Sequence, residues 1–130
     1  MTVGAIRRDG FSTPFFEGTA GGELRIRTCR TCGHRSVPLT RQCPACRSTD
    51  LGWEPASGRG RVVSWAVVHG RAGADGVPQR TVIGMVELDE GPWLNAQLAV
   101  DPDEVSVGSA VQVRFETPEG GEAVPLFELA

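Results

Sequence analysis

The sequence predicts a mainly β protein in which a short N-terminal helix and a metal-held cysteine ribbon precede a five-stranded barrel. All four cysteines lie within residues 29–46, and five short apolar segments follow between residues 61 and 129. A stretch near the N-terminus carries a helix start signal. A chain of 130 residues has room for a small metal-held module attached to a modest β domain. We therefore expect three parts: an N-terminal arm over residues 1–23, a ribbon over 24–56 and a barrel over 57–130.

The segment STPFFEGTAGGEL, which starts at Ser12, predicts the short helix. Thr13 is expected as its N-cap and Pro14 as its first helical residue, and the Gly-Gly pair should end it. Phe15 and Phe16 cannot bury themselves on so short a helix. Two interpretations remain open: the two rings pack against this protein's own barrel, or they insert into a partner.

The four cysteines form the pattern C-x2-C-x10-C-x2-C, which is typical of a metal site. A structural zinc ion takes four thiolates, and each CxxC turn lets two sulfurs reach one ion. Gly33 supplies backbone freedom after the first pair, and Pro44 stiffens the second turn. We predict a closed structural zinc site made by Cys29, Cys32, Cys43 and Cys46. Iron is the alternative, because the Cys-Pro-x-Cys turn also occurs in rubredoxins, and it would make the chain an electron carrier.

The ribbon around these cysteines is too small to hold a core of its own. The segments ELRIRT and TDLGWE read as short strands on either side of the cysteines. Metal binding should therefore supply the folding free energy of the ribbon, which amounts to roughly 10–16 kcal/mol in comparable zinc peptides.

The remaining segments predict a barrel of the OB type. Strands are expected over residues 61–69, 81–90, 93–100, 110–116 and 123–129. The first is an almost continuous apolar run, so both of its faces should be covered, and a long loop, GRAGADGVPQR, should follow it. The later strands alternate apolar and polar residues. Five short strands without a substantial helix, in this order of connections, fit a five-stranded Greek-key barrel.

Charge is distributed unevenly along the chain. Residues 25–61 hold eight arginines and two acids, a net charge of +6, whereas residues 62–130 hold three arginines and eleven acids, a net charge of −8. Such asymmetry marks a surface for an anionic ligand or another protein. A nucleic-acid-binding ribbon and barrel is the alternative, since Trp65 and Trp93 could stack on bases. The acidic barrel makes nucleic acid an unlikely ligand.

Residues suited to catalysis are scarce. The cysteines are allocated to metal, no GxSxG, HExxH or phosphate-binding motif occurs, and the histidines are His34 and His69. We predict no catalytic residue. The N-terminus lacks the apolar run of a signal peptide and no segment approaches a membrane span, so the chain is expected to be cytoplasmic.

The order of these features resembles a known family, long catalogued as a domain of unknown function, that joins a rubredoxin-like zinc ribbon to an acyl-CoA-associated OB-fold. The matching pieces are TPFFEG, GEL, CRTCG, CPAC, SGRGRVVSWAVVH, VELDEGPWL, VGSAV and VPLF, which run from about residue 9 to 130. The family pattern leads us to expect tryptophan at Phe16 and a proline nearer Arg80, and the sequence departs from it at both places.

The resemblance implies an accessory, largely non-catalytic role. Such domains accompany thiolase-like enzymes of the lipid-transfer type, or hot-dog-fold hydratases, that act on acyl-CoA thioesters. In steroid catabolism the partner is an aldolase that cleaves a β-hydroxyacyl-CoA side chain by retro-aldol chemistry. The resemblance also implies two sets of contacts. Arg59, Arg61, Arg35 and Arg41 are candidates for CoA phosphates, and Phe15, Phe16, Trp65 and Trp93 are candidates for the partner interface.

Overall fold

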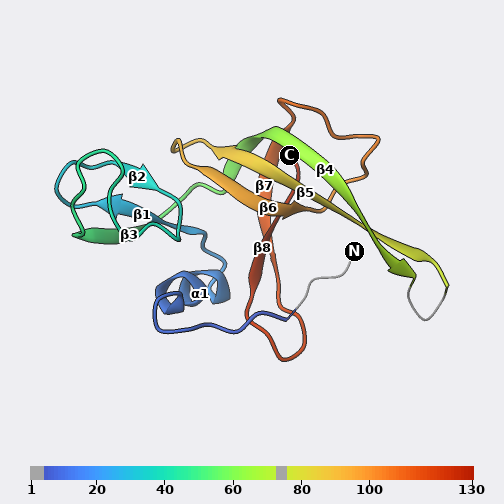
Figure 1. Ribbon diagram of the computed structural model, residues 1–130, viewed down its shortest axis with the longest axis horizontal. Coiled ribbons are helices and arrows are strands. Elements are labelled where there is room, and N and C mark those ends of the chain that lie inside the picture. The colour runs from blue at the N-terminus through green and yellow to red at the C-terminus, as the bar shows by residue number, and fades with distance from the viewer. Residues whose placement is uncertain (1–4, 73–75) are drawn as a thin grey trace.

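The computed structural model describes residues 5–72 and 76–130, which form one helix and two mainly antiparallel sheets (Figure 1). The ribbon sheet and the helix lie at one end of the molecule and the barrel at the other. The elements are α1 (Thr13–Ala20), β1 (Arg25–Cys29), β2 (Arg35–Ser36), β3 (Leu51–Pro55), β4 (Arg59–Ala72), β5 (Pro78–Leu88), β6 (Trp93–Leu98), β7 (Ala110–Glu116) and β8 (Val124–Leu129).

Helix α1 begins at Thr13, and Ser12 is its N-cap, so the prediction of Thr13 as the cap was wrong by one residue. The reason lies in the preceding turn. The backbone N–H of Asp9 donates to Ser12 Oγ at 2.9 Å, and the N–H of Ser12 donates to Asp9 Oδ1 at 2.8 Å. These reciprocal bonds make Ser12 the N-cap, one residue earlier than the position of Pro14 suggested. The helix ends at the Gly-Gly pair as predicted, with Gly22 at a φ of +79°.

The ribbon is a three-stranded antiparallel sheet in the order β2-β1-β3. Strand β1 pairs along its whole length with β3, from Arg25 opposite Pro55 to Cys29 opposite Leu51. The two segments predicted as strands on either side of the cysteines therefore pair with each other. This pairing brings the two ends of the cysteine segment together.

The barrel is closed, in the order β4-β5-β6-β8-β7, with β7 returning to β4. Strands β6 and β8 run parallel, and the other neighbours are antiparallel. This is the five-stranded barrel of the OB type that the sequence predicted. Its alternating segments place one face inward, as Val82, Val86 and Leu88 of β5 show by their burial.

A single core joins the ribbon sheet to the barrel. Val86, Leu98 and Phe127 have no exposed surface, and they pack in one cluster with Leu24 and Ile26 from the start of the ribbon. A second, much smaller cluster lies within the ribbon and consists of Cys29, Cys43 and Leu51. The start of β1 is therefore anchored by the barrel, whereas the cysteine end has little apolar packing.

Two expectations for the first barrel strands were wrong. The outer face of β4 is not covered, since Val68 is 47% exposed and its neighbour Ile83 on β5 is 44% exposed. The long loop is mostly strand, because antiparallel pairing continues past an irregularity as far as Ala72 opposite Pro78. The centre of the expected loop, residues 73–75, lies outside the described residues.

Within the described part of the chain, α1 is much too short to span a bilayer, and no helix qualifies as a candidate membrane span.

Candidate metal centre and adjoining groove

The four cysteine sulfurs converge at the end of the ribbon. They lie within 4.8 Å of one another, and the Sγ atoms of Cys29 and Cys46, and of Cys32 and Cys43, are 3.6 Å apart. Zinc–sulfur bonds of about 2.3 Å in a tetrahedron place the sulfurs about 3.8 Å apart. The cluster therefore has the size that a tetrahedral metal ion requires.

The two CxxC turns have the same backbone geometry. The N–H of Gly33 donates to the Cys29 carbonyl at 2.8 Å, and the N–H of Arg47 donates to the Cys43 carbonyl at 2.8 Å. The residue after each second cysteine has a positive φ, +81° at Gly33 and +65° at Arg47. The predicted role of Gly33 is confirmed, and the equivalent role of Arg47 was missed because arginine gives no signal for this conformation.

Hydrogen bonds from backbone amides in the turns, together with burial and contacts between the sulfurs, give the four thiols different pKa values. The N–H groups of Cys32 and Thr31 stabilise the Cys29 thiolate and lower its pKa to about 6. At Cys46 the N–H of Ser48 also favours the thiolate, but burial and hydrogen bonds with the other sulfurs outweigh it and raise the pKa to about 12. Four thiolates this close cannot all carry charge without a cation between them. The donor set thus fits a divalent metal, which would deprotonate the remaining thiols.

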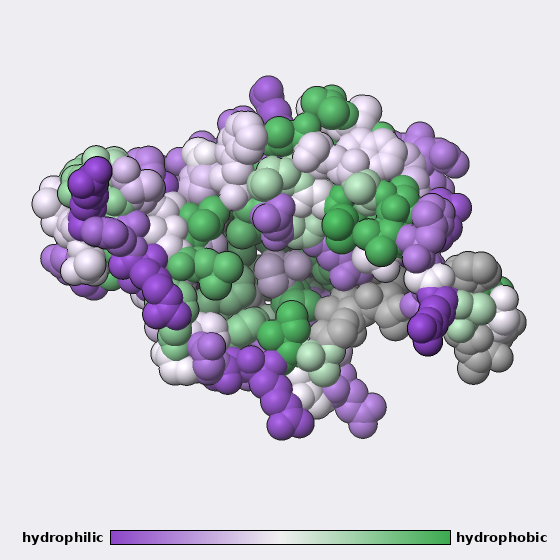
Figure 2. Space-filling model, viewed as in Figure 1, coloured by the Kyte–Doolittle hydropathy of each residue, from purple (hydrophilic) through white to green (hydrophobic). Residues whose placement is uncertain are grey.

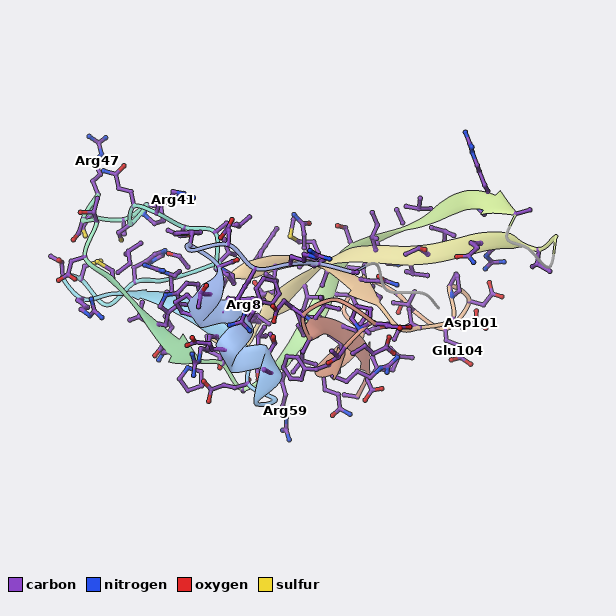
Figure 3. All side chains as sticks on the ribbon, turned by 90° about the horizontal axis from the view of Figure 1, so that it is seen from below. Arg8, Arg41, Arg47, Arg59, Asp101 and Glu104 are labelled. Atoms are coloured by element: carbon purple, nitrogen blue, oxygen red, sulfur yellow. The ribbon has the colours of Figure 1, made fainter. Side chains whose placement is uncertain are left out.

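Several arginines of the basic ribbon are already paired. Arg30 contacts Asp50 at 3.0 Å, and Arg35 contacts Glu54 at 2.7 Å. The four arginines predicted to contact an anion do not converge, because Arg59 and Arg61 lie at the start of β4. Figure 3 shows Arg41 and Arg47 at the ribbon end of the molecule and Arg59 on another side.

An apolar groove of about 700 Å³ lies where the N-terminal arm, the ribbon and the barrel meet. Figure 2 shows hydrophobic side chains around the hollow between these parts. Most of its lining is aromatic or aliphatic, and it includes Phe11, Phe15, Phe16, Val37, Pro38, Leu39, Trp53, Trp93, Leu94 and Leu126. We call this the arm–ribbon groove. Its volume suits a small-molecule ligand.

Two guanidinium groups stack at the ribbon side of the groove. Arg41 lies 3.9 Å from the centre of the Phe11 ring, and Arg27 lies 4.3 Å from that of Trp53 and 5.9 Å from that of Phe11. Burial lowers the pKa of Arg27, although a guanidinium keeps its charge at neutral pH. Its Nε is buried without a hydrogen-bond partner among the described residues. The guanidinium groups of Arg27 and Arg41 therefore lie on aromatic rings of the apolar wall, and Arg7 is the arginine among the residues that line the groove.

Three of the four aromatic residues predicted at a partner interface line this groove. Phe16 is 8% exposed, and Phe15 packs against the barrel core, so both rings make contacts within the chain. Trp93 is 53% exposed, and its Nε1 donates to Glu87 Oε2 at 2.9 Å. Trp65 is separate, because it packs on the core from β4. Phe11, Trp53 and Arg27 were missed, since no spacing in the sequence links them.

The chain is similar in sequence to proteins described as DUF35 domain-containing scaffold proteins. It is 32% identical over 82 residues to one from Pyrococcus furiosus, which covers 62% of this chain and 60% of that relative. It is 32% identical over 97 residues to one from Methanothermobacter thermautotrophicus, and this match covers 72% of this chain and 73% of that relative. The matched part thus spans less than two thirds of the Pyrococcus relative. Residues 53–116 also match a family model described as the ChsH2 C-terminal OB-fold domain.

Two solved structures resemble the whole chain. A chain of a structure described as an Ltp2-ChsH2(DUF35) aldolase superposes with a TM-score of 0.79 at 29% identity, covering 98% of both chains. A DUF35 protein of unknown function from Sulfolobus solfataricus superposes with a TM-score of 0.64 at 15% identity, covering 93% of this chain and 86% of the other. The second likeness concerns the fold alone.

Proposed function

Because the chain belongs to the DUF35 family, we propose that it is a scaffold subunit of a cytoplasmic acyl-CoA-metabolising complex, and that its partner is a thiolase-like aldolase. One observation carries this proposal. The likeness to a chain of the Ltp2-ChsH2(DUF35) aldolase extends over 98% of both chains, so arm, ribbon and barrel are all included. A nucleic-acid role has no comparable support.

The finer part of the proposal concerns the reaction. The partner breaks a carbon–carbon bond in a steroid side-chain β-hydroxyacyl-CoA by retro-aldol cleavage. In that step a base removes the proton of the β-hydroxyl group, the α–β bond breaks, and the electron pair passes to the thioester enolate. The partner supplies the base and the groups that polarise the thioester, while this chain shapes the assembly.

The arm–ribbon groove supports an acyl-CoA ligand at or near the interface. Its apolar walls match an acyl or pantetheine chain, and the guanidinium groups stacked on its aromatic residues match phosphate. Of the four arginines that the sequence suggested for this role, only Arg41 stacks on a residue that lines the groove. We therefore assign the anion contact to Arg41 together with Arg27.

Zinc is the metal we propose for the four-cysteine cluster, in a structural role. The sulfur spacing and the four thiol ligands leave no position for substrate. Metal analysis of purified protein should find one zinc per chain. A coloured protein with visible absorbance would identify iron and would favour the alternative function of an electron carrier.

Co-expression with any thiolase-like protein that is encoded beside it tests the scaffold role. Size exclusion with light scattering should show one complex that contains both chains. A partner that is soluble, stable and fully active alone, and that never co-elutes with this chain, would contradict the proposal.

Titration with an acyl-CoA tests the groove separately, with tryptophan fluorescence as the readout, because two of the three tryptophans, Trp53 and Trp93, line the groove. Arg41→Glu should weaken binding by roughly tenfold, because it replaces an attractive charge by a repulsive one. Arg59→Glu is the matched control and should leave binding unchanged. Equal losses in both variants would show that the groove is not the binding site.

A further inference from the structure

Strand β4 extends well past the end of its pairing with β7, so part of one of its edges is unpaired. On that edge it pairs with β7 only over Arg59–Arg61, and the last contact is made by Val62, whose N–H donates to the Ser109 carbonyl and whose carbonyl accepts from Gly108. No other strand of the described chain pairs with this edge between residues 63 and 72. The other edge is paired with β5 as far as Ala72. Figures 1 and 3 show the resulting hairpin projecting from the barrel.

The register identifies which backbone groups face the open edge. The N–H of Leu88 donates to the Pro92 carbonyl, on the β6 side of β5, so the even-numbered residues of β5 bond toward β6 and the odd-numbered ones toward β4. The odd-numbered residues are opposite Ser64, Ala66 and Val68 of β4. The groups between them, on Trp65, Val67 and His69, therefore point away from β5 into the open edge.

The composition of this edge is unusual for one left uncovered. Residues 63–72, VSWAVVHGRA, contain no proline and no acid, and four of the ten, Val63, Trp65, Val67 and Val68, have high β propensity. A long, apolar, unpaired edge is a template for pairing with another chain, and proteins normally blunt such edges. Val68 and Ile83 add exposed apolar surface on the same hairpin. Figure 2 shows hydrophobic side chains gathered over it. The edge has the properties of a surface that a partner covers.

Charge indicates what kind of partner covers it. Residues 62–86 hold two arginines, Arg71 and Arg80, against one acid, whereas residues 87–130 hold ten acids and one arginine. The acidity of the barrel is therefore segregated away from the hairpin. Pairing of two copies of this chain would bring two basic hairpins together, which is unfavourable. An added strand that carries acidic side chains would complement them.

We propose that the open edge of β4 accepts an extended, acidic and apolar segment of the thiolase-like subunit as an added strand. This inference rests on the proposed function, because it takes the partner from it. Main-chain hydrogen bonds to Trp65, Val67 and His69 provide affinity, while Arg71 and Arg80 select for acidic side chains.

Amide hydrogen exchange of the full complex tests the added strand directly. In the free chain the amides of Trp65, Val67 and His69 exchange fast, and those of Ala66 and Val68 exchange slowly because they bond to β5. In the complex the first three should slow by at least about tenfold, while the other two stay slow. This alternating pattern belongs to strand addition, since simple coverage of the hairpin would not select every second residue.

Two matched pairs of variants test the same contacts. His69→Pro removes an outward N–H, and His69→Ala removes the side chain alone, so the proline should bind the partner about five- to tenfold more weakly than the alanine. The double variant Arg71→Glu with Arg80→Glu should weaken the complex, and Arg59→Glu, at an exposed position outside the open edge, should not.

The outcomes separate this inference from the scaffold role. A complex that forms while the three amides exchange as in the free chain would overturn the added strand and leave the scaffold role intact. Protection that appears in the chain alone as its concentration rises would identify a second copy as the occupant, which also overturns the inference. If no complex forms with the wild-type chain, both proposals fail.

Discussion

Removal of one metal ligand, by Cys43→Ser, should unfold the ribbon and spare the barrel. The local cluster around the metal contains only Cys29, Cys43 and Leu51, whose burial contributes no more than about 5 kcal/mol. A structural zinc ion contributes roughly 10–16 kcal/mol in comparable peptides. Loss of the metal therefore removes most of what holds residues 29–50 in place. The start of β1 should remain folded, because Leu24 and Ile26 belong to the barrel core.

Limited trypsin digestion measures this prediction, since the ribbon carries its own cleavage sites. Cleavage of Cys43→Ser should occur after Arg30, Arg35, Arg41 and Arg47. The barrel should stay intact, with its thermal unfolding transition retained. Ala45→Ser is the matched control, because it adds a hydroxyl in the same turn at an exposed position that is not a ligand. It should keep both the metal and the resistance to trypsin.

The reasoning is refuted if Cys43→Ser, or wild-type protein stripped of metal by a chelator, keeps a ribbon as resistant to trypsin as the metal-loaded protein. Such a result would mean that packing with the barrel, rather than the metal, supplies the folding free energy of the ribbon.

Three further changes have defined outcomes. Arg47→Gly should raise the free energy of unfolding of the metal-loaded protein by about 1 kcal/mol in denaturant titrations, because glycine accepts the positive φ, and Gly33→Ala in the equivalent turn should lower it. Gly60→Ala should destabilise the barrel by about 1–3 kcal/mol, since its Cβ would clash with the carbonyl oxygen of Glu87 in β5; an unchanged melting temperature would contradict this. The hydrogen bond from Arg8 lowers the pKa of Glu122 below its ordinary value, so the contribution of this ion pair to the arm's attachment is complete above the ordinary pKa and is lost as the pH falls through the lowered one. Cleavage of the arm at Phe11 by pepsin, which is active at low pH, should rise over that range, and Glu122→Gln should abolish the pH dependence.

The cysteine spacing predicted the cluster because each CxxC turn lets two sulfurs reach one ion, and two such turns complete a four-sulfur site. The alternating segments predicted the barrel for a similar reason: a period of two residues determines which side chains face inward. Both signals are local, and the structure confirmed both.

The remaining features depend on contacts between distant residues. Phe11, Arg27 and Trp53 meet only because the arm folds back over the ribbon, and no spacing predicts this. The exposed outer face of β4 was missed because an apolar run gives the same pattern whether it is covered by its own chain or by a partner. The positive φ of Arg47 was missed because the turn around the metal, rather than the residue type, imposes it.

The scaffold role is tested most directly by the retro-aldol activity of the purified thiolase-like subunit, titrated with this chain. Activity should rise with added chain and saturate at a fixed molar ratio, and metal-stripped chain should give less activity at every ratio. A partner that reaches full activity alone, and that this chain neither raises nor stabilises, would contradict the account.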